Sequence, residues 1–185
     1  MIDGIKNETK EKMEKSIESL QAQFRKIRTG RASVDMLDGI KVNYYGTPTP
    51  LQQVGNVSTP DAKTIVIQPW EKNLISEIEK AILASNLGIT PQNDGNLVRL
   101  SVPAVTEQRR KELAKECKVI AEDIKVAVRN VRQHSNEQIK KAEKNKELSE
   151  DLSKDAQADV QKITDSYIAK IDELLVAKEK EVLNG

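Results

Sequence analysis

Arginine is the residue type whose placement in this chain points most directly to chemistry. There are only eight arginines, against 22 lysines. Arg129 and Arg132, together with Lys125, lie in a window from 124 to 136 that holds no acidic residue. At about 100° per residue in a helix, the three side chains fall within an arc of roughly 60°, about a right angle from the nearest apolar stripe. We therefore expect them to project outward together, as a cationic face.

A planar guanidinium binds phosphate oxygens in a bidentate manner, so a row of arginines suits a nucleic-acid backbone. The alternative is that these arginines pair with residues 149–185, which carry nine acidic and five basic residues. Both interpretations stay open at this point. Aromatic residues make up only 3% of the chain, which argues against a protein that stacks single-stranded bases. Structured RNA recognised by its shape and phosphates fits better.

Other arginines gather where the sequence pattern changes. Arg28 and Arg31 lie in a stretch without acidic residues between Glu18 and Asp35. Arg109 and Arg110 lie just after the second change, where helical spacing resumes near residue 105.

The sequence contains few of the residues and motifs that an enzyme active site needs. His134 is the only histidine, and no phosphate loop, zinc-ligand spacing or nucleophile elbow is present. Cys117, the only cysteine, lies in an apolar stripe, which predicts a core residue and a reducing compartment. We expect no enzymatic activity, no metal and no cofactor. No apolar run approaches the roughly 20 residues that span a bilayer, and no signal peptide is evident, so we expect a cytoplasmic protein without membrane contact.

Three apolar stripes with helical spacing must position the cationic face. The first ends near Ile27, with Gly30 as the expected helix stop. The second begins near Pro103–Thr106, and the third begins at Ser149. Three narrow stripes in one chain predict a three-helix bundle. The stripes comprise Met13, Ile17, Leu20, Phe24 and Ile27; Leu113, Cys117, Ile120, Ile124, Ala127 and Val131; and Ala156, Val160, Ile163, Tyr167, Ile171, Leu174 and Val182.

Between the first two stripes the pattern becomes that of a small β/α/β domain. Ser33 is expected to cap a single turn. The stretch 46–50, Gly-Thr-Pro-Thr-Pro, is expected to interrupt regular structure because proline lacks a backbone donor. Strands are predicted at 40–44, 51–57, 64–67 and 97–102, with a turn at 59–61, a hairpin turn at 93–96, and a helix from Leu74 to Ile82 that is closed by Gly88.

The predicted architecture is thus α+β, an elongated three-helix bundle formed by residues 1–29 and 105–185, with residues 31–103 inserted as a separate domain. Both ends of the insert return to the same bundle, so the two crossings must lie side by side and form a hinge. The expected hinge residues are Thr29, Gly30 and Arg31 in the first crossing and Val102, Pro103, Ala104 and Val105 in the second.

Three strings in this order and spacing closely resemble bacterial ribosome recycling factor. They are KIRTGRAS (26–33), LDGIKVNYYGTPTPLQQ (37–53) and VAVRNVR (126–132). The resemblance covers essentially the whole chain. It implies an L-shaped monomer, similar in outline to transfer RNA, that binds ribosomal RNA of the 50S subunit and works with elongation factor G to disassemble the ribosome after termination.

The resemblance also assigns residues. It implies that Arg129 and Arg132 contact ribosomal RNA, that the insert is a mobile arm pushed by elongation factor G, and that the remaining arginines support binding. These supports are Arg28, Arg31, Arg109 and Arg110.

Two positions depart from the family pattern. Val34 replaces a proline, which loosens the turn that enters the insert, and Gln133 replaces a basic residue, which removes one phosphate contact. The competing function is a helical adaptor or holdase-type chaperone that would use the apolar stripes or the Tyr44/Tyr45 surface for protein contacts.

Overall fold

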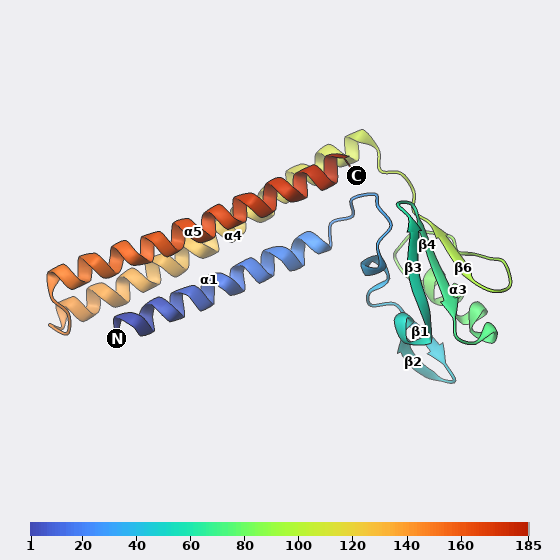
Figure 1. Cartoon of the computed structure of the whole chain (residues 1–185), viewed down its shortest axis with the longest axis horizontal. Helices are drawn as coiled ribbons and strands as arrows, with labels where there is room; N and C mark the ends of the chain where they lie inside the picture. Colours follow the sequence, from blue (N-terminus) through green and yellow to red (C-terminus); the bar gives the residue numbers. More distant parts are fainter. Residues whose placement is uncertain (185) are drawn as a thin grey trace. The chain divides into compact units, whose positions relative to one another are not determined.

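The computed structural model describes residues 1–184 and divides into two compact units (Figure 1). One unit comprises Met1–Ile27 and Glu107–Asn184, and the other comprises Arg28–Thr106. The stretches 29–31 and 102–105 both fall within the second unit. Across residues 1–184, no helix is long and apolar enough to cross a membrane.

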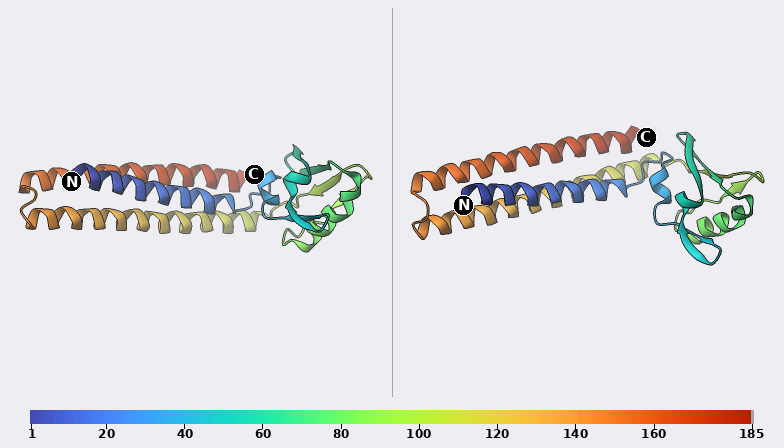
Figure 2. Two further views of the ribbon diagram at one scale, coloured as in Figure 1. Left: turned by 90° about the horizontal axis from the view of Figure 1, so that it is seen from below. Right: turned by 60° about the horizontal axis from the view of Figure 1, so that its bottom comes forward.

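The first unit is a bundle of three helices, α1 (Ile2–Arg25), α4 (Glu107–Lys144) and α5 (Glu150–Asn184). Figure 2 shows α1 running alongside the other two helices in both views. Each helix buries a narrow stripe at 3–4 residue spacing, and none would be stable alone in water. The buried apolar residues of the bundle include Met13, Ile17, Leu20, Phe24, Leu113, Cys117, Ala121, Ile124, Val128, Ile139, Ala156, Val160, Ile171 and Val182.

The expected stop of α1 at Gly30 is wrong. The helix ends at Arg25, and it is closed by the backbone N–H of Lys26, which donates to the carbonyl of Gln23, and by that of Ile27, which donates to the carbonyl of Phe24. Gly30 does adopt the left-handed conformation, with φ +82°. A Cβ at Gly30 would lie 2.9 Å from Cγ2 of Val105. The glycine is therefore required first by this backbone conformation, and the approach of Val105 in the second crossing adds to it, although Gly30 does not cap α1.

The first two helical elements of the insert are short. Ser33 accepts a hydrogen bond from the backbone N–H of Asp35 and so caps the 3₁₀ turn η1 (Val34–Leu37), as expected. A single helical turn, α2 (Leu51–Val54), replaces the start of the strand predicted at 51–57.

A four-stranded antiparallel sheet forms the centre of the insert, in the order β3-β4-β6-β5. Helix α3 (Ile75–Ala84), preceded by the 3₁₀ turn η2 (Lys72–Leu74), ends four residues before Gly88. The helix buries Ile75, Ile78 and Ile82 in the same core as the sheet residues Ile65, Ile67 and Leu100. The four strands are β3 (Gly55–Asp61), β4 (Thr64–Pro69), β5 (Gln92–Asn93) and β6 (Val98–Ser101).

The expected break at the proline-rich stretch is also wrong. Residues 47–50 form strand β2 (Thr47–Pro50), which pairs with β1 (Lys41–Tyr44) in a two-stranded sheet. The N–H of Leu51 donates to the carbonyl of Ile40. Strand alternation then directs the donors of Thr47 and Thr49 toward β1 and places Pro48 and Pro50 on the outer edge. Proline is tolerated there because the missing donor faces outward.

Both crossings are fixed to the same turn of the insert. The backbone N–H of Ala32 donates to the carbonyl of Ala62, and that of Val102 donates to the carbonyl of Lys63, each at 2.7 Å. Ala62 and Lys63 are consecutive residues between β3 and β4. The segments that enter and leave the insert therefore lie side by side.

Gly55 is the position at which the insert tolerates no side chain. Its backbone is extended, with φ −166°, so any residue could adopt the conformation. A Cβ, however, would lie 2.7 Å from the carbonyl oxygen of Gln68 and 3.0 Å from Cα of Pro69. Both atoms belong to the backbone of β4, the strand paired with β3.

We expect Gly55→Ala to lower the free energy of unfolding of the insert by about 1–3 kcal/mol, because β3 and β4 must separate locally to admit the methyl group. Trp70, the only tryptophan, directly follows β4, so its fluorescence during urea unfolding reports on this unit. Gly4→Ala is the control, since nothing lies within 4 Å of a Cβ there. Equal stabilities of Gly55→Ala and the parent chain would contradict the contact argument.

Candidate functional site

Two of the three cationic residues predicted to form the face, Lys125 and Arg132, contact residues of α5. Lys125, Arg129 and Arg132 are spaced by four and three residues, and Arg129 is exposed while Arg132 is half-buried. We call Arg129 and Arg132 the arginine face.

Lys125 does not project outward, contrary to expectation. Its Nζ lies 2.5 Å from Oδ1 of Asp172 on α5 and 3.5 Å from Glu122, and only 13% of its side chain is exposed. The hydrogen bond to Asp172 raises the pKa of Lys125 above its ordinary value, against the opposing effect of burial. Helical angle alone misplaced this group because the long lysine side chain reaches across to the neighbouring helix.

The two arginines behave differently from Lys125. An Nη of Arg132 donates to Oε1 of Gln161 on α5 at 3.3 Å. Gln161 is neutral, so this contact orients the guanidinium without cancelling its charge. Within residues 1–184, neither Arg129 nor Arg132 forms an ion pair with an acidic residue. Pairing with the acidic third helix therefore accounts for Lys125 and not for the arginines.

Next to Arg132 lies an open groove of about 340 Å³ between α4 and α5. Oδ1 of Asn136 is buried and accepts no hydrogen bond from the residues at 1–184. The groove thus offers a cation and side-chain amides to a polar ligand. Its lining residues are Arg132, Gln133, Asn136, Glu137, Lys140 and Gln161.

The sequence argument missed most of this groove. The spacing of Arg132, Asn136 and Lys140 by four residues was an available signal, because such residues share a helix face. Gln161 gave no signal, since its approach to Arg132 depends on how α5 packs against α4.

The supporting arginines are held by contacts of their own. Arg109 pairs with Glu112 at 3.1 Å and Glu116 at 3.5 Å, and Arg110 donates to the carbonyl of Leu183. These two residues lie roughly 28 Å along α4 from Arg129 at 1.5 Å per residue. A ligand that reaches both places must be extended.

In the insert, Arg28 donates to the carbonyl of Leu87 at 3.2 Å, which ties the first crossing to the loop after α3. Arg31 is exposed.

The groups with catalytic potential lie apart from this groove. His134 is exposed, whereas Cys117 is fully buried and burial raises the pKa of its thiol. Among residues 1–184, no three His, Cys, Asp or Glu side chains are arranged to hold a metal ion.

Comparison with known proteins gives one consistent result. A family model described as ribosome recycling factor matches residues 20–183. The chain is 55% identical over 183 residues to the ribosome-recycling factor of Nitratidesulfovibrio vulgaris (strain DP4), covering 99% of this chain and 98% of that protein. It is 53% identical over 182 residues to the ribosome-recycling factor of Bdellovibrio bacteriovorus, covering 98% of each.

Two solved structures are also similar. A solution structure of the ribosome recycling factor matches with a TM-score of 0.78 and 40% identity, covering 100% of this chain and 98% of the other. The second is a chain from an assembly of the T. thermophilus ribosome recycling factor and E. coli elongation factor G bound to the E. coli post-termination complex. It matches with a TM-score of 0.65 and 43% identity over 99% of both chains.

The contact between Lys125 and Asp172 gives a prediction about pH. Because the folded-state pKa of Lys125 is raised above 10.5, its stabilising effect should be fully present below about pH 10 and lost as the pH rises through the folded-state pKa. Lys125→Met should therefore be less stable than the parent chain near neutral pH, with the difference shrinking above about pH 11. Urea unfolding followed by helical circular dichroism measures this.

Lys154→Met is the matched control, because it removes an exposed ion pair with Glu150 on α5 and should change stability little. A stability difference for Lys125→Met that stays constant into strong alkali would show that the ammonium does not stabilise the fold.

Proposed function

The chain belongs to the ribosome recycling factor family, and from that membership we propose that its arginine face binds ribosomal RNA of the large subunit. The protein is a translation factor that, with elongation factor G, disassembles the post-termination ribosome. It acts by binding and transmitting motion, without catalysing a reaction itself. It acts on ribosomes in the cytoplasm.

The uncancelled charge of Arg129 and Arg132 carries this proposal. A structural arginine on this helix would be expected to pair with one of the nine acidic residues at 149–185, as Lys125 does with Asp172. Instead, Arg132 is steadied by a neutral amide beside an open polar groove. Guanidinium groups that remain charged and oriented suit phosphate and base edges of structured RNA.

The other cationic residues support this face. Arg109 and Arg110 extend the contact along α4, and Arg28 and Arg31 would add separate contacts from the insert. Lys125 contributes by holding α4 against α5, so that Arg132 and Gln161 stay together. Gln133, at a position where the family has a basic residue, lines the groove as a neutral group and leaves more of the affinity to Arg132.

We further propose that Thr29–Arg31 and Val102–Val105 form the hinge through which the insert moves. Neither stretch belongs to a helix or a strand. The hydrogen bonds of Ala32 and Val102 to the turn at Ala62 and Lys63 mark where each crossing becomes fixed to the insert. Between these anchors and the helices, the side chain of Arg28 also holds the first crossing to the carbonyl of Leu87, and the remaining residues would bend in this proposal.

We expect Arg132→Ala to weaken binding to 50S subunits by about 5- to 150-fold, since loss of such a contact costs on the order of 1–3 kcal/mol. Co-sedimentation at moderate salt measures the binding, and circular dichroism should show unchanged helicity. Arg99→Ala, which removes an exposed arginine of the insert, should bind almost as the parent chain does. If Arg132→Ala bound equally well, the RNA face would lie elsewhere.

The hinge proposal predicts where the folded chain is cut first. A protease of broad specificity should cleave within residues 27–31 and 103–106 before any other site, because local opening there breaks few backbone hydrogen bonds. Mass spectrometry of early fragments identifies the sites. First cuts inside α1, α4 or α5 would argue against a hinge at these residues.

A further inference from the structure

A second groove lies on the other flank of α5, between that helix and α1, with a volume of about 390 Å³. We call it the lysine groove. Lys10 and Glu14 of α1 and Lys162, Ser166, Tyr167 and Lys170 of α5 line it. The groove therefore contains three ammonium groups and one carboxylate. This excess of positive charge contrasts with segment 149–185 as a whole, which is strongly acidic.

The single carboxylate of the groove already has partners. The hydroxyl of Tyr167 donates to Oε2 of Glu14 at 3.0 Å, and Nζ of Lys170 lies 3.7 Å from Oε1. Both oxygens of Glu14 thus face groups of α5. Glu14 joins the two helices and leaves most of the positive charge of the groove available.

The charges of Lys10 and Lys162 remain available to a ligand, as do those of some other lysines of the bundle, such as Lys115 and Lys118. Both are exposed, and neither forms an ion pair within residues 1–184. Many other bundle lysines do pair with a carboxylate. These are Lys6, Lys12, Lys15, Lys111, Lys125, Lys154, Lys170 and Lys178.

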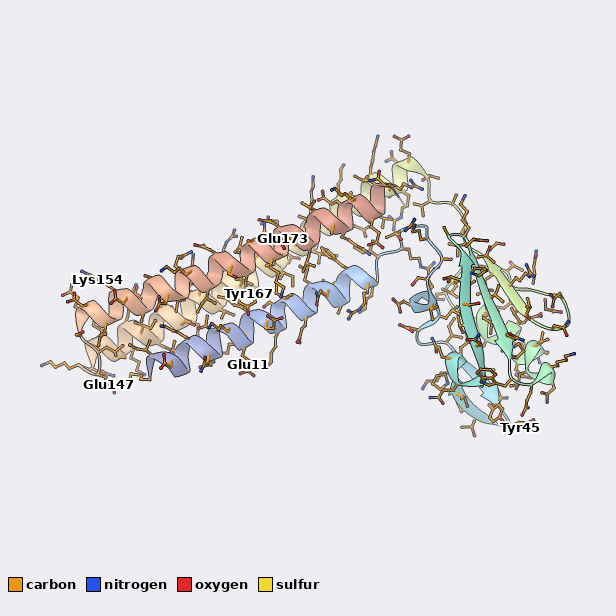
Figure 3. The ribbon with its side chains drawn as sticks, viewed as in Figure 1. Glu11, Tyr45, Glu147, Lys154, Tyr167 and Glu173 are labelled. Atoms are coloured by element: carbon orange, nitrogen blue, oxygen red, sulfur yellow. The ribbon has the colours of Figure 1, made fainter. Side chains whose placement is uncertain are left out.

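Tyr167 gives the groove a fixed wall. Figure 3 shows its side chain on α5, and its hydroxyl also approaches the carbonyl of Lys10 at 3.4 Å. Burial and the contact with Glu14 raise the pKa of the phenol, so the hydroxyl stays protonated and remains a donor. The backbone positions that carry Lys10 and Lys162 are therefore held relative to one another before any ligand binds.

The length of the groove indicates the kind of anion. From Lys162 to Lys170, α5 advances about 12 Å at 1.5 Å per residue. That distance exceeds a single phosphate and suits successive phosphates of a chain. Lysine also binds phosphate as a point charge, without needing the planar geometry of a base edge.

We propose that the lysine groove is a second RNA-binding site, at which Lys10, Lys162 and Lys170 contact backbone phosphates and Ser166 donates its hydroxyl. Gln161 lines the groove beside Arg132, and Lys162 is the next residue of the same helix. The bundle would then hold RNA on both flanks of α5. This inference rests on the proposed function, because large-subunit RNA is the ligand in both cases.

The test uses the full-length chain with Lys10→Gln and Lys162→Gln combined, since neither side chain forms an ion pair within residues 1–184. The control combines Lys115→Gln and Lys118→Gln, two exposed lysines of α4 that form no ion pair within residues 1–184. Both variants lose the same charge. Circular dichroism and thermal unfolding should match the parent chain in each.

Binding to 50S subunits is measured across a range of salt concentrations. The slope of log affinity against log salt should become shallower by about one to two in the groove variant, because each phosphate contact contributes about 0.7–0.9. Its affinity at low salt should fall about tenfold, with a smaller effect in the control. Replacing the same two lysines by arginine should retain the parent slope.

A groove variant that cannot be distinguished from its control would overturn the proposal. So would a defect seen with intact subunits but absent with protein-free large-subunit RNA, since the ligand would then be an acidic ribosomal protein. In either case, if Arg132→Ala still bound 50S subunits more weakly than the parent chain, the proposed function would remain supported. If the parent chain showed no salt-dependent binding at all, both proposals would fall together.

Discussion

The fold depends on one constraint, which is that the chain must leave the bundle after α1 and return to it at α4 without disturbing either core. Two backbone hydrogen bonds to consecutive residues meet this constraint. Ala32 is fixed to Ala62, and Val102 is fixed to Lys63, so both ends of the insert meet at a single turn. The close approach of Gly30 and Val105 continues this pairing. The α/β unit can therefore complete its own core, and the three helices can complete theirs.

Periodicity predicted the helices well because burial of a narrow stripe is a property that each helix carries in its own sequence. Met13, Ile17 and Leu20 are buried as expected. The errors arose where distant residues decide local structure. Gly30 has the left-handed conformation of a helix stop, yet it lies beyond the end of α1 and packs against Val105, which lies 75 residues further along the chain. Likewise, the proline-rich strand forms because β1 lies beside it.

In the candidate site, too, the sequence predicted what one helix determines alone and missed what depends on a second helix. Helical spacing correctly placed Arg129 and Arg132 together, because the two residues share one helix. It could not distinguish them from Lys125, whose partner Asp172 lies on another helix. The distinction matters for function, since an ammonium held by a carboxylate supports the scaffold, whereas a guanidinium beside a neutral amide keeps its charge for a ligand. The side chain that the neighbouring helix places beside a cationic residue thus decides whether that residue stabilises the bundle or remains available to bind a ligand.

The outer edge of β2 has a further consequence. An exposed strand with free donors can pair with the same strand of another copy, which is a common start of aggregation. Pro48 and Pro50 occupy the outward positions of β2, so that edge offers carbonyl acceptors but lacks the donors that a neighbouring strand would need. The hairpin can therefore remain uncovered at the surface of the insert without recruiting a second chain. In a crowded cell, this edge protects the folded protein from forming mixed sheets.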